Sequence, residues 1–373
     1  MPKLLTIILL LLGNACLTEK LYQELEPRTL PSQAPPSGLP SSSAELCGAC
    51  HTEIYEEWKS SMMGQSFTDP VFQAEWHHMR EFPWCLNCHA PLQNQQPMIV
   101  EGLSSLTPPT ARGQTNPDFD PALQAEGVTC VVCHQSEAGL RAPHADTQAP
   151  HAVVYDPTLA TSGSCEPCHQ MNILPFTKVE RPLTDSHNEW EEWKTLSGKS
   201  DDCLDCHMPA VTRPVVTGGI PRDGRKHTFG GAWDDAIVQS ALAVGEPIRT
   251  TDGVEVELEN LAGHRFPSGE PARIVWIRLH LLDETGNRVG GVENRIDRRV
   301  ETPGARERYD TTLAPMERRI IRLTVDRDLA SKADSAYLEV SFDRFGNLDT
   351  VLEELQGSEL VQEIILAKRV VPW

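Results

Sequence analysis

The motif Cys-x-x-Cys-His occurs five times in this chain and constrains its fold more than any other feature. Its cysteines are Cys47, Cys50, Cys85, Cys88, Cys130, Cys133, Cys165, Cys168, Cys203 and Cys206, and the histidines that follow them are His51, His89, His134, His169 and His207. In such a motif the two thiols form thioethers to haem, and the histidine binds one axial position of the iron. The sequence therefore predicts five covalently bound c-type haems, whose porphyrins supply much of the core.

Cysteine pairs at this spacing also bind zinc or act as redox dithiols. Neither kind of site requires a histidine directly after the second cysteine, whereas all five pairs have one. The motifs use every cysteine of the chain except Cys16. We therefore favour haem over zinc and predict no disulfide framework.

The N-terminus is typical of an exported protein. Residues 1–15 contain an apolar run that is too short to span a membrane, as in a signal peptide. The run ends at Gly13-Asn14-Ala15-Cys16, which is similar to a bacterial lipoprotein cleavage box and makes Cys16 a candidate lipid anchor. The alternative is ordinary cleavage, with Cys16 as a plain thiol. Residues 16–45 are rich in Pro and Ser, which predicts an extended tether or a disordered leader.

The remaining chain divides by composition into two expected domains. Residues 46–235 carry the haem motifs, and we expect a mostly irregular and α-helical pentahaem cytochrome domain with short helices at 53–60 and 72–79. Residues 236–373 lack cysteine and predict a small all-β, sandwich-like domain. Its expected strands are 254–258, 274–282, 319–325 and 338–342, and 360–371 is either strand or helix.

The charge of the chain limits its partners. With 33 basic and 53 acidic residues the formal net charge is −20, so nucleic acid is excluded as a partner. An acidic surface favours basic redox proteins as electron donor or acceptor, although charge alone names neither.

A second axial ligand decides what each iron does. Bis-histidine ligation suits electron transfer, whereas an open position binds substrate. Outside the motifs, the histidines considered are His77, His78, His144, His151, His187, His227, His264 and His280. His77 and His78 are adjacent on a predicted helix and point about 100° apart, so at most one of them meets a given iron, and we favour His78. His280 alternates with apolar residues on a predicted strand, so we expect it to face solvent or a neighbouring surface.

Several short segments around the motifs point to a known family. They are Trp58–Met63, Gly127–Thr129, Glu189-Trp190, Cys206–Pro209 and Asn260–Gly269. With the motifs, they make residues 46–267 resemble the multihaem cytochromes c of the cytochrome c-554/c-prime and hydroxylamine oxidoreductase-related family.

The resemblance implies distal ligands at His227 and His264, with His144 and His151 as further candidates. Met63 stands where family members often have histidine. Either its thioether is a ligand that raises the potential of that haem, or Met63 packs in the core and another residue is the ligand.

The leading hypothesis is an electron carrier with five haems, located outside the cytoplasmic membrane, in the periplasm or at the cell surface. The alternative is an oxidoreductase of a small nitrogen or sulfur compound at one haem with open coordination. No motif histidine is replaced by lysine, so the proximal-lysine site of pentahaem nitrite reductases is absent. The β domain would brace the last haem, dock a partner or act as an adhesive module.

Overall fold

The structure is a computed structural model that describes residues 34–106, 109–144, 148–171, 181–301, 306–348, 353, 355 and 358–373. The signal segment, Cys16 and most of the expected tether lie outside these residues. The described chain divides into two compact units. The first, the motif unit, comprises residues 34–168 and 202–229, and the second, the β unit, comprises residues 169–171, 181–201 and 230–373, within the described ranges.

This division differs from the expected boundary at residue 235. The segment between the fourth and fifth motifs folds with the C-terminal strands rather than with the motifs. Its residues contact the β unit through side chains that are far away in sequence: Arg181 is bound to Asp310, and the backbone carbonyl of Pro182 accepts a hydrogen bond of 2.6 Å from Arg298. Composition along the chain could not reveal these long-range ion pairs.

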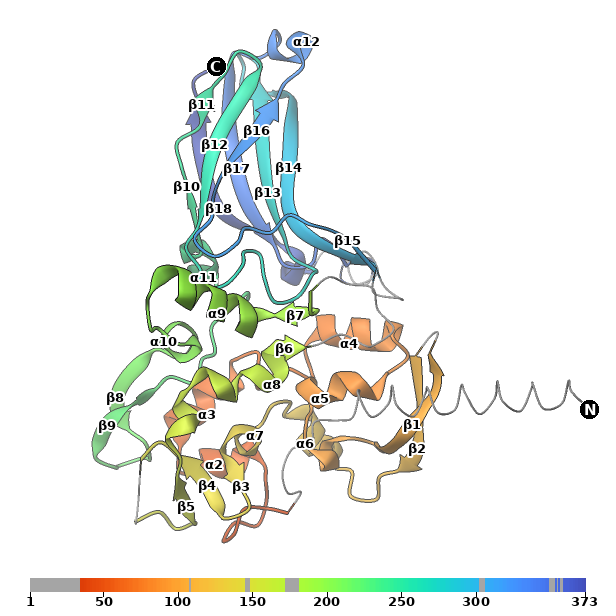
Figure 1. Ribbon diagram of the computed structural model, residues 1–373, viewed down its shortest axis with the longest axis vertical. Helices are drawn as coiled ribbons and strands as arrows, with labels where there is room; N and C mark the ends of the chain where they lie inside the picture. The colour runs from red at the N-terminus through yellow and green to blue at the C-terminus, as the bar shows by residue number, and fades with distance from the viewer. Residues whose placement is uncertain are drawn as a thin grey trace, which may run out of the picture. The chain divides into compact units, whose positions relative to one another are not determined.

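The motif unit consists of short helices and hairpins (Figure 1). Its helices are α2 (Ala44–Gly48), α3 (Thr52–Lys59), α4 (Pro70–His78), α5 (Leu86–His89), α6 (Pro121–Ala125), α7 (Cys130–His134), α8 (Glu166–His169), whose last residue belongs to the β unit, and α10 (Cys203–His207). Its strands are β1 (Met98–Leu106), β2 (Pro109–Thr115), β3 (Gln135–Ser136), β4 (Gly139–Ala142), β5 (Val153–Tyr155), β8 (Ala210–Pro214) and β9 (Pro221–Arg225). The helices α3 and α4 confirm the two helices predicted from apolar spacing, while the β1–β2 and β8–β9 hairpins were not anticipated.

The described part of the β unit contains two large antiparallel sheets and the two-stranded sheet β6–β7 (Figure 1). One has the order β10-β12-β11, with β16 also paired to β12, and the other has the order β15-β14-β13-β17-β18. Their strands are β10 (Leu242–Val244), β11 (Ile248–Arg249), β12 (Gly253–Asn260), β13 (Ile274–Leu282), β14 (Arg288–Glu301), β15 (Arg306–Asp310), β16 (Arg318–Thr324), β17 (Ser335–Asp343) and β18 (Ile364–Val371). The unit also contains β6 (Gln170–Met171), β7 (Thr184–Asp185), α9 (Ser186–Ser197), α11 (Asp235–Ser240) and α12 (Arg327–Ala330).

Alternation along the strands produces a common core for the two sheets. In β13, Val275, Ile277, Leu279 and Leu281 are fully buried, and they belong to the same apolar cluster as Leu258 of β12. Apolar side chains at every second position lie on one face of a strand, so both sheets direct an apolar face into one interior. The ambiguous segment near the C-terminus is strand β18.

His280 is buried, so of the two environments expected for it, solvent or a neighbouring surface, the structure shows the second. Its exposed fraction is 7%, and its ring stacks on Tyr337 of β17 with centroids 4.6 Å apart. On the other side it pairs with Gly291 of β14. The alternation of side chains along β13 correctly placed His280 on the face opposite the apolar core. The ring of Tyr337 covers that outer face at this position.

Candidate haem-binding site

Each Cys-x-x-Cys-His motif forms one short helical turn or borders one. Motifs three and five coincide with α7 and α10, and motifs two and four with α5 and α8, each preceded by its first cysteine. Residues at i, i+3 and i+4 lie on one face of a helix. The local fold therefore presents both thiols and the imidazole of a motif to the same side, as covalent haem attachment requires.

The motif histidines of the first three motifs share one orientation. Nδ1 of His51 lies 2.9 Å from the carbonyl oxygen of Val215, Nδ1 of His89 lies 2.8 Å from that of Ser66, and Nδ1 of His134 lies 2.9 Å from that of Arg141. A proton at Nδ1 donated to a carbonyl leaves Nε2 as the nitrogen with a free lone pair. This second-sphere hydrogen bond is typical of histidines that bind a metal.

Two candidate distal histidines lie opposite motif histidines. His134 and His227 have ring centroids 6.3 Å apart, and His51 and His151 have ring centroids 6.5 Å apart. Two imidazoles that bind one iron through Nε2 from opposite sides have centroids about 6 Å apart, because each metal–nitrogen bond is about 2 Å long and the ring centre lies about 1 Å further. The residues present therefore fit a bis-histidine haem at each pair.

The electrostatics at the His134–His227 pair suit metal binding. Burial and the neighbouring His134 lower the pKa of His227 to about 4, and burial also lowers the pKa of His134. Both rings are therefore neutral at physiological pH, which is the form that coordinates a metal. Nδ1 of His227 lies 3.1 Å from the carbonyl oxygen of Arg225, so its Nε2 is also free.

The motifs of this unit lie side by side. The side chains of Cys47 and Cys130 lie next to each other, so the first motif adjoins the third. Cys165 and Cys203 also lie next to each other, so the fourth motif adjoins the fifth. Cys133 interacts electrostatically with Cys168, so the third motif adjoins the fourth. This adjacency connects four motifs in the order one, three, four and five.

The second motif is connected to the third by the segment between Met63 and Ser66. The backbone carbonyl of Ser66 accepts a hydrogen bond from Nδ1 of His89. The hydroxyl oxygen of Ser66 accepts a second hydrogen bond, of 3.0 Å, from the backbone N–H of Val128. Gly127 precedes this contact with a φ of 61°, and a side chain there would collide with Ser66 Oγ. This explains the glycine in the Gly127–Thr129 segment.

Comparisons with known proteins concern the first three motifs and the fold. The family model of cytochrome c554 and c-prime matches residues 46–135. The fold is similar to the crystal structure of a penta-haem cytochrome c552 from Thermochromatium tepidum, with a TM-score of 0.64 and 21% identity over 91% of this chain and 100% of that chain. Residues 46–135 therefore match the cytochrome c554 family, and the fold of the chain is similar to that of a penta-haem cytochrome c. Among curated proteins, none matches the sequence significantly.

The other candidate ligands occupy varied positions. His78 is exposed at the end of α4, and His144 is exposed next to residues that are not described. His187 is half-buried on α9, with its ring 5.3 Å from that of Trp190. His264 belongs to the β unit, as does the motif histidine His169, and Nδ1 of His264 lies 2.8 Å from the carbonyl oxygen of Arg265. Their roles as ligands stay predictions.

Met63 is half-buried, and its carbonyl accepts a hydrogen bond of 3.0 Å from the N–H of Val128. Its turn therefore approaches His89 from the Nδ1 side, which faces away from the iron that His89 would bind. This position gives Met63 a structural role between the second and third motifs. A ligand role for its thioether stays a prediction.

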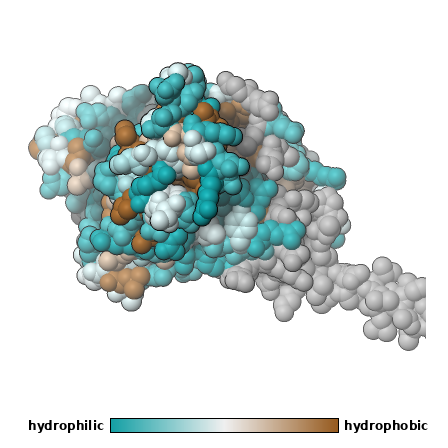
Figure 2. Space-filling view, turned by 90° about the horizontal axis from the view of Figure 1, so that it is seen from above, coloured by the Kyte–Doolittle hydropathy of each residue, from teal (hydrophilic) through white to brown (hydrophobic). Residues whose placement is uncertain are grey.

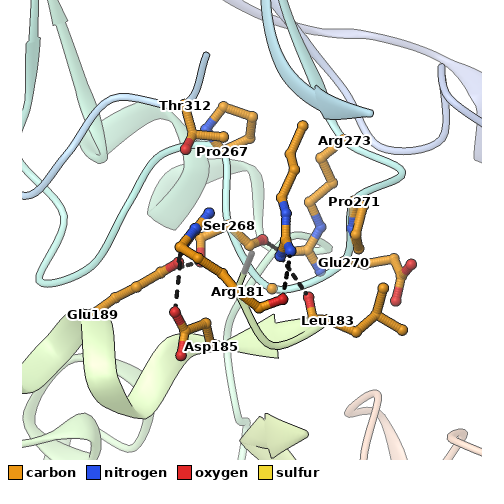
Figure 3. Close-up of a pocket in the computed structure, with 12 residues that line it drawn as sticks. Arg181, Leu183, Asp185, Glu189, Pro267, Ser268, Glu270, Pro271, Arg273 and Thr312 are labelled. Carbon is orange, nitrogen blue, oxygen red and sulfur yellow. Dashed lines mark hydrogen bonds and ion pairs between the residues drawn. The ribbon is translucent and has the colours of Figure 1, made fainter. Parts of the chain in front are cut away.

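A small pocket lies within the β unit (Figure 3). Its lining includes Arg181, Asp185, Glu189, Arg273 and Arg298. The guanidinium groups of Arg181 and Arg298 are already bound: Arg181 contacts Glu189 at 2.8 Å and also binds Asp310, while Arg298 donates to carbonyl oxygens at 181–183 and to a carboxylate. Because these charges are internally compensated, the pocket is a structural ion-pair network and not an anion site.

Two residues next to His227 were missed by the sequence analysis. Glu57 on α3 and Arg213 on β8 form a double hydrogen bond of 2.5 and 2.6 Å. Glu57 is one of several acidic residues on its helix, and Arg213 follows the fifth motif in a hairpin that the sequence did not reveal. No local signal distinguishes them, because their partners come from distant parts of the chain.

Proposed function

We propose that the protein transfers electrons through five covalently bound c-type haems. The observation that carries this proposal is the opposed arrangement of His134 with His227 and of His51 with His151. When bound, each haem supplies a reversible one-electron iron couple, and two histidine ligands suit it to electron transfer rather than substrate binding. The ten motif cysteines hold the porphyrins, and the five motif histidines orient them.

The contacts between motifs support a relay. Cys47 with Cys130 and Cys165 with Cys203 join pairs of attachment sites within the motif unit. We infer that electrons pass between neighbouring haems along this series of motifs.

Other redox proteins are the proposed partners. The net charge of −20 favours a basic donor or acceptor, and nucleic acid is not a proposed partner. Figure 2 shows a mainly hydrophilic surface at the end of the molecule that carries α12, with small separate hydrophobic patches. For the β unit we propose bracing of the last haem or docking of a partner.

We propose export across the cytoplasmic membrane, with Cys16 as a lipid anchor. The signal-like run in residues 1–15 and the cleavage box support this proposal. None of the described helices is both long and apolar enough to cross a bilayer. Incorporation of labelled palmitate into the wild-type protein and its loss in Cys16→Ser would test the anchor.

Haem counting and electron paramagnetic resonance test the proposed function together. A pyridine haemochrome assay should give five haems c per chain. Resonance spectra of the oxidised protein should show low-spin irons, including those of the two histidine pairs. Fewer haems, or high-spin iron at both pairs, would overturn the proposal.

A second candidate function concerns the haem of the second motif. Among the described residues, the ring that contacts His89 is that of Phe72, with centroids 3.8 Å apart and planes 8° apart, rather than a second imidazole. Five-coordinate iron at this motif would bind a small nitrogen or sulfur compound as an oxidoreductase does. Addition of nitrite or hydroxylamine would then change a high-spin signal, and a spectrum without such a response would exclude this candidate.

A further inference from the structure

Glu57 connects the helix after the first motif with the candidate ligand His227. Its Oε1 and Oε2 accept from the two terminal nitrogens of Arg213 at 2.5 and 2.6 Å. Oε2 also accepts the backbone N–H of His227 at 2.8 Å. The side chains of Glu57 and Arg213 are 18% and 11% exposed. A largely buried bidentate pair of this kind has strong geometric constraints.

Arg213 also contacts the residue that orients the imidazole. Its Nη2 lies 3.4 Å from the carbonyl oxygen of Arg225, which is the oxygen that accepts from Nδ1 of His227. The pair therefore fixes His227 in two ways. Glu57 holds its backbone, and Arg213 approaches the acceptor of its ring.

We propose that Glu57 and Arg213 are positioning residues that hold His227 opposite His134 and tune the potential of the haem bound there. This inference rests on the proposed function, because it requires His227 to be a distal ligand. The carboxylate favours the oxidised, more positive haem and lowers its potential, whereas the guanidinium raises it. The two charges thus act on the haem with opposite signs.

A similar arrangement occurs beside His264 in the β unit. Glu189 is 5% exposed, accepts from Arg181 at 2.8 Å and accepts the backbone N–H of Arg265 at 3.1 Å. Arg265 directly follows His264. A carboxylate–guanidinium pair therefore binds the backbone at His227 and next to His264, which favours a common positioning role.

The test uses charge-removing variants of the complete haem-loaded protein. In a spectroelectrochemical titration, Glu57→Gln should shift the potential of one haem upward and Arg213→Gln should shift one haem downward. The double variant should return close to the wild-type value. A purely structural pair would give shifts of one sign or no shift at all.

Glu363→Gln is a matched control. Glu363 forms a similar double hydrogen bond with Arg278 in the β unit, at 2.5 and 2.8 Å, without contact to a candidate ligand. It should leave every haem potential unchanged. Arg213→Lys keeps the charge but loses the fork geometry, so it should retain the potential while changing the low-spin resonance signal of one haem.

His227→Ala separates this inference from the proposed function. If His227→Ala converts no haem to high spin, the ligand assignment and the inference fail together. If it does so while Glu57→Gln and Arg213→Gln leave all potentials unchanged, only the positioning role is overturned. If a Gln variant fails to bind five haems, Arg213→Lys is used in its place to test the positioning role. An unchanged resonance spectrum in a folded Arg213→Lys variant would overturn the inference.

Discussion

The rings of His134 and His227 face each other with centroids 6.3 Å apart and planes 25° apart. The two residues come from the third motif and from the segment after the fifth. Each has its Nδ1 bound to a backbone carbonyl. This distance matches the one expected for two imidazoles on one iron, so His227 is the proposed distal ligand of a haem at the third motif.

The second histidine pair predicts the effect of replacing His151. The rings of His51 and His151 are 6.5 Å apart, and we expect His151→Ala to remove the distal ligand of the first haem. One low-spin signal should disappear from the resonance spectrum, and one high-spin signal should appear. His77→Ala is the control, because His77 is exposed and is not a favoured ligand, so this variant should leave the spectrum unchanged. The same result for both variants would contradict the assignment.

Asp310 predicts an acid-sensitive contribution to the stability of the β unit. Although burial raises the pKa of its carboxyl, hydrogen bonds from Thr312 and the charge of Arg181 outweigh this effect and hold the pKa below its ordinary value. The folded state thus binds protons less readily than the unfolded state, so stabilisation is present above a pH of about 4 and is lost below it.

Asp310→Asn should cost about 2 kcal/mol in the free energy of unfolding near neutral pH, the scale of a charge-assisted hydrogen bond. The difference from wild type should shrink as the pH falls below about 4. Denaturant unfolding at several pH values measures this effect. A difference that stays constant with pH would refute the ionic origin.

The buried ring of His280 predicts a second pH dependence of the stability, in a higher pH range than that of Asp310. Burial lowers its pKa, and neither ring nitrogen has a hydrogen-bond partner. The folded state disfavours the protonated ring, so stability should fall as the pH drops below about 6.5, the ordinary histidine value. Phenylalanine can keep the stack on Tyr337 without a group to protonate.

We therefore expect His280→Phe to stabilise the protein by about 1 kcal/mol and to remove this part of the pH dependence. Unfolding at pH 8 and pH 5 would measure both effects. A destabilised variant, or one with an unchanged pH profile, would show that the ring makes a polar interaction that stabilises the fold.

Leu279 tests the common core of the two sheets. It is fully buried on β13, and Leu279→Ala should reduce the free energy of unfolding by about 2–5 kcal/mol. Its neighbour Arg278 is partly exposed on the other face, so Arg278→Lys is a milder control on the same strand. Equal losses would argue against a core centred on Leu279.

Local sequence determined much of this protein. The Cys-x-x-Cys-His spacing is local, and the helical turns found at the motifs bring residues i, i+3 and i+4 to one face without help from distant segments. Alternation predicted β12, β13, β16 and β17, because the side-chain period of a strand is also local. The helices around Trp58 and Trp76 were likewise predicted from a local period, that of apolar residues at helical spacing.

Only the tertiary structure decided which histidines face each other. His144 and His151 both follow the third motif, yet His144 is exposed and His151 lies opposite His51 of the first motif. Similarly, Glu57 acquires a special position only because a hairpin after the fifth motif brings Arg213 and His227 to it. A distal ligand and its supporting charges depend on contacts between segments far apart in sequence, and the spacing of residues along the chain carries no record of those contacts.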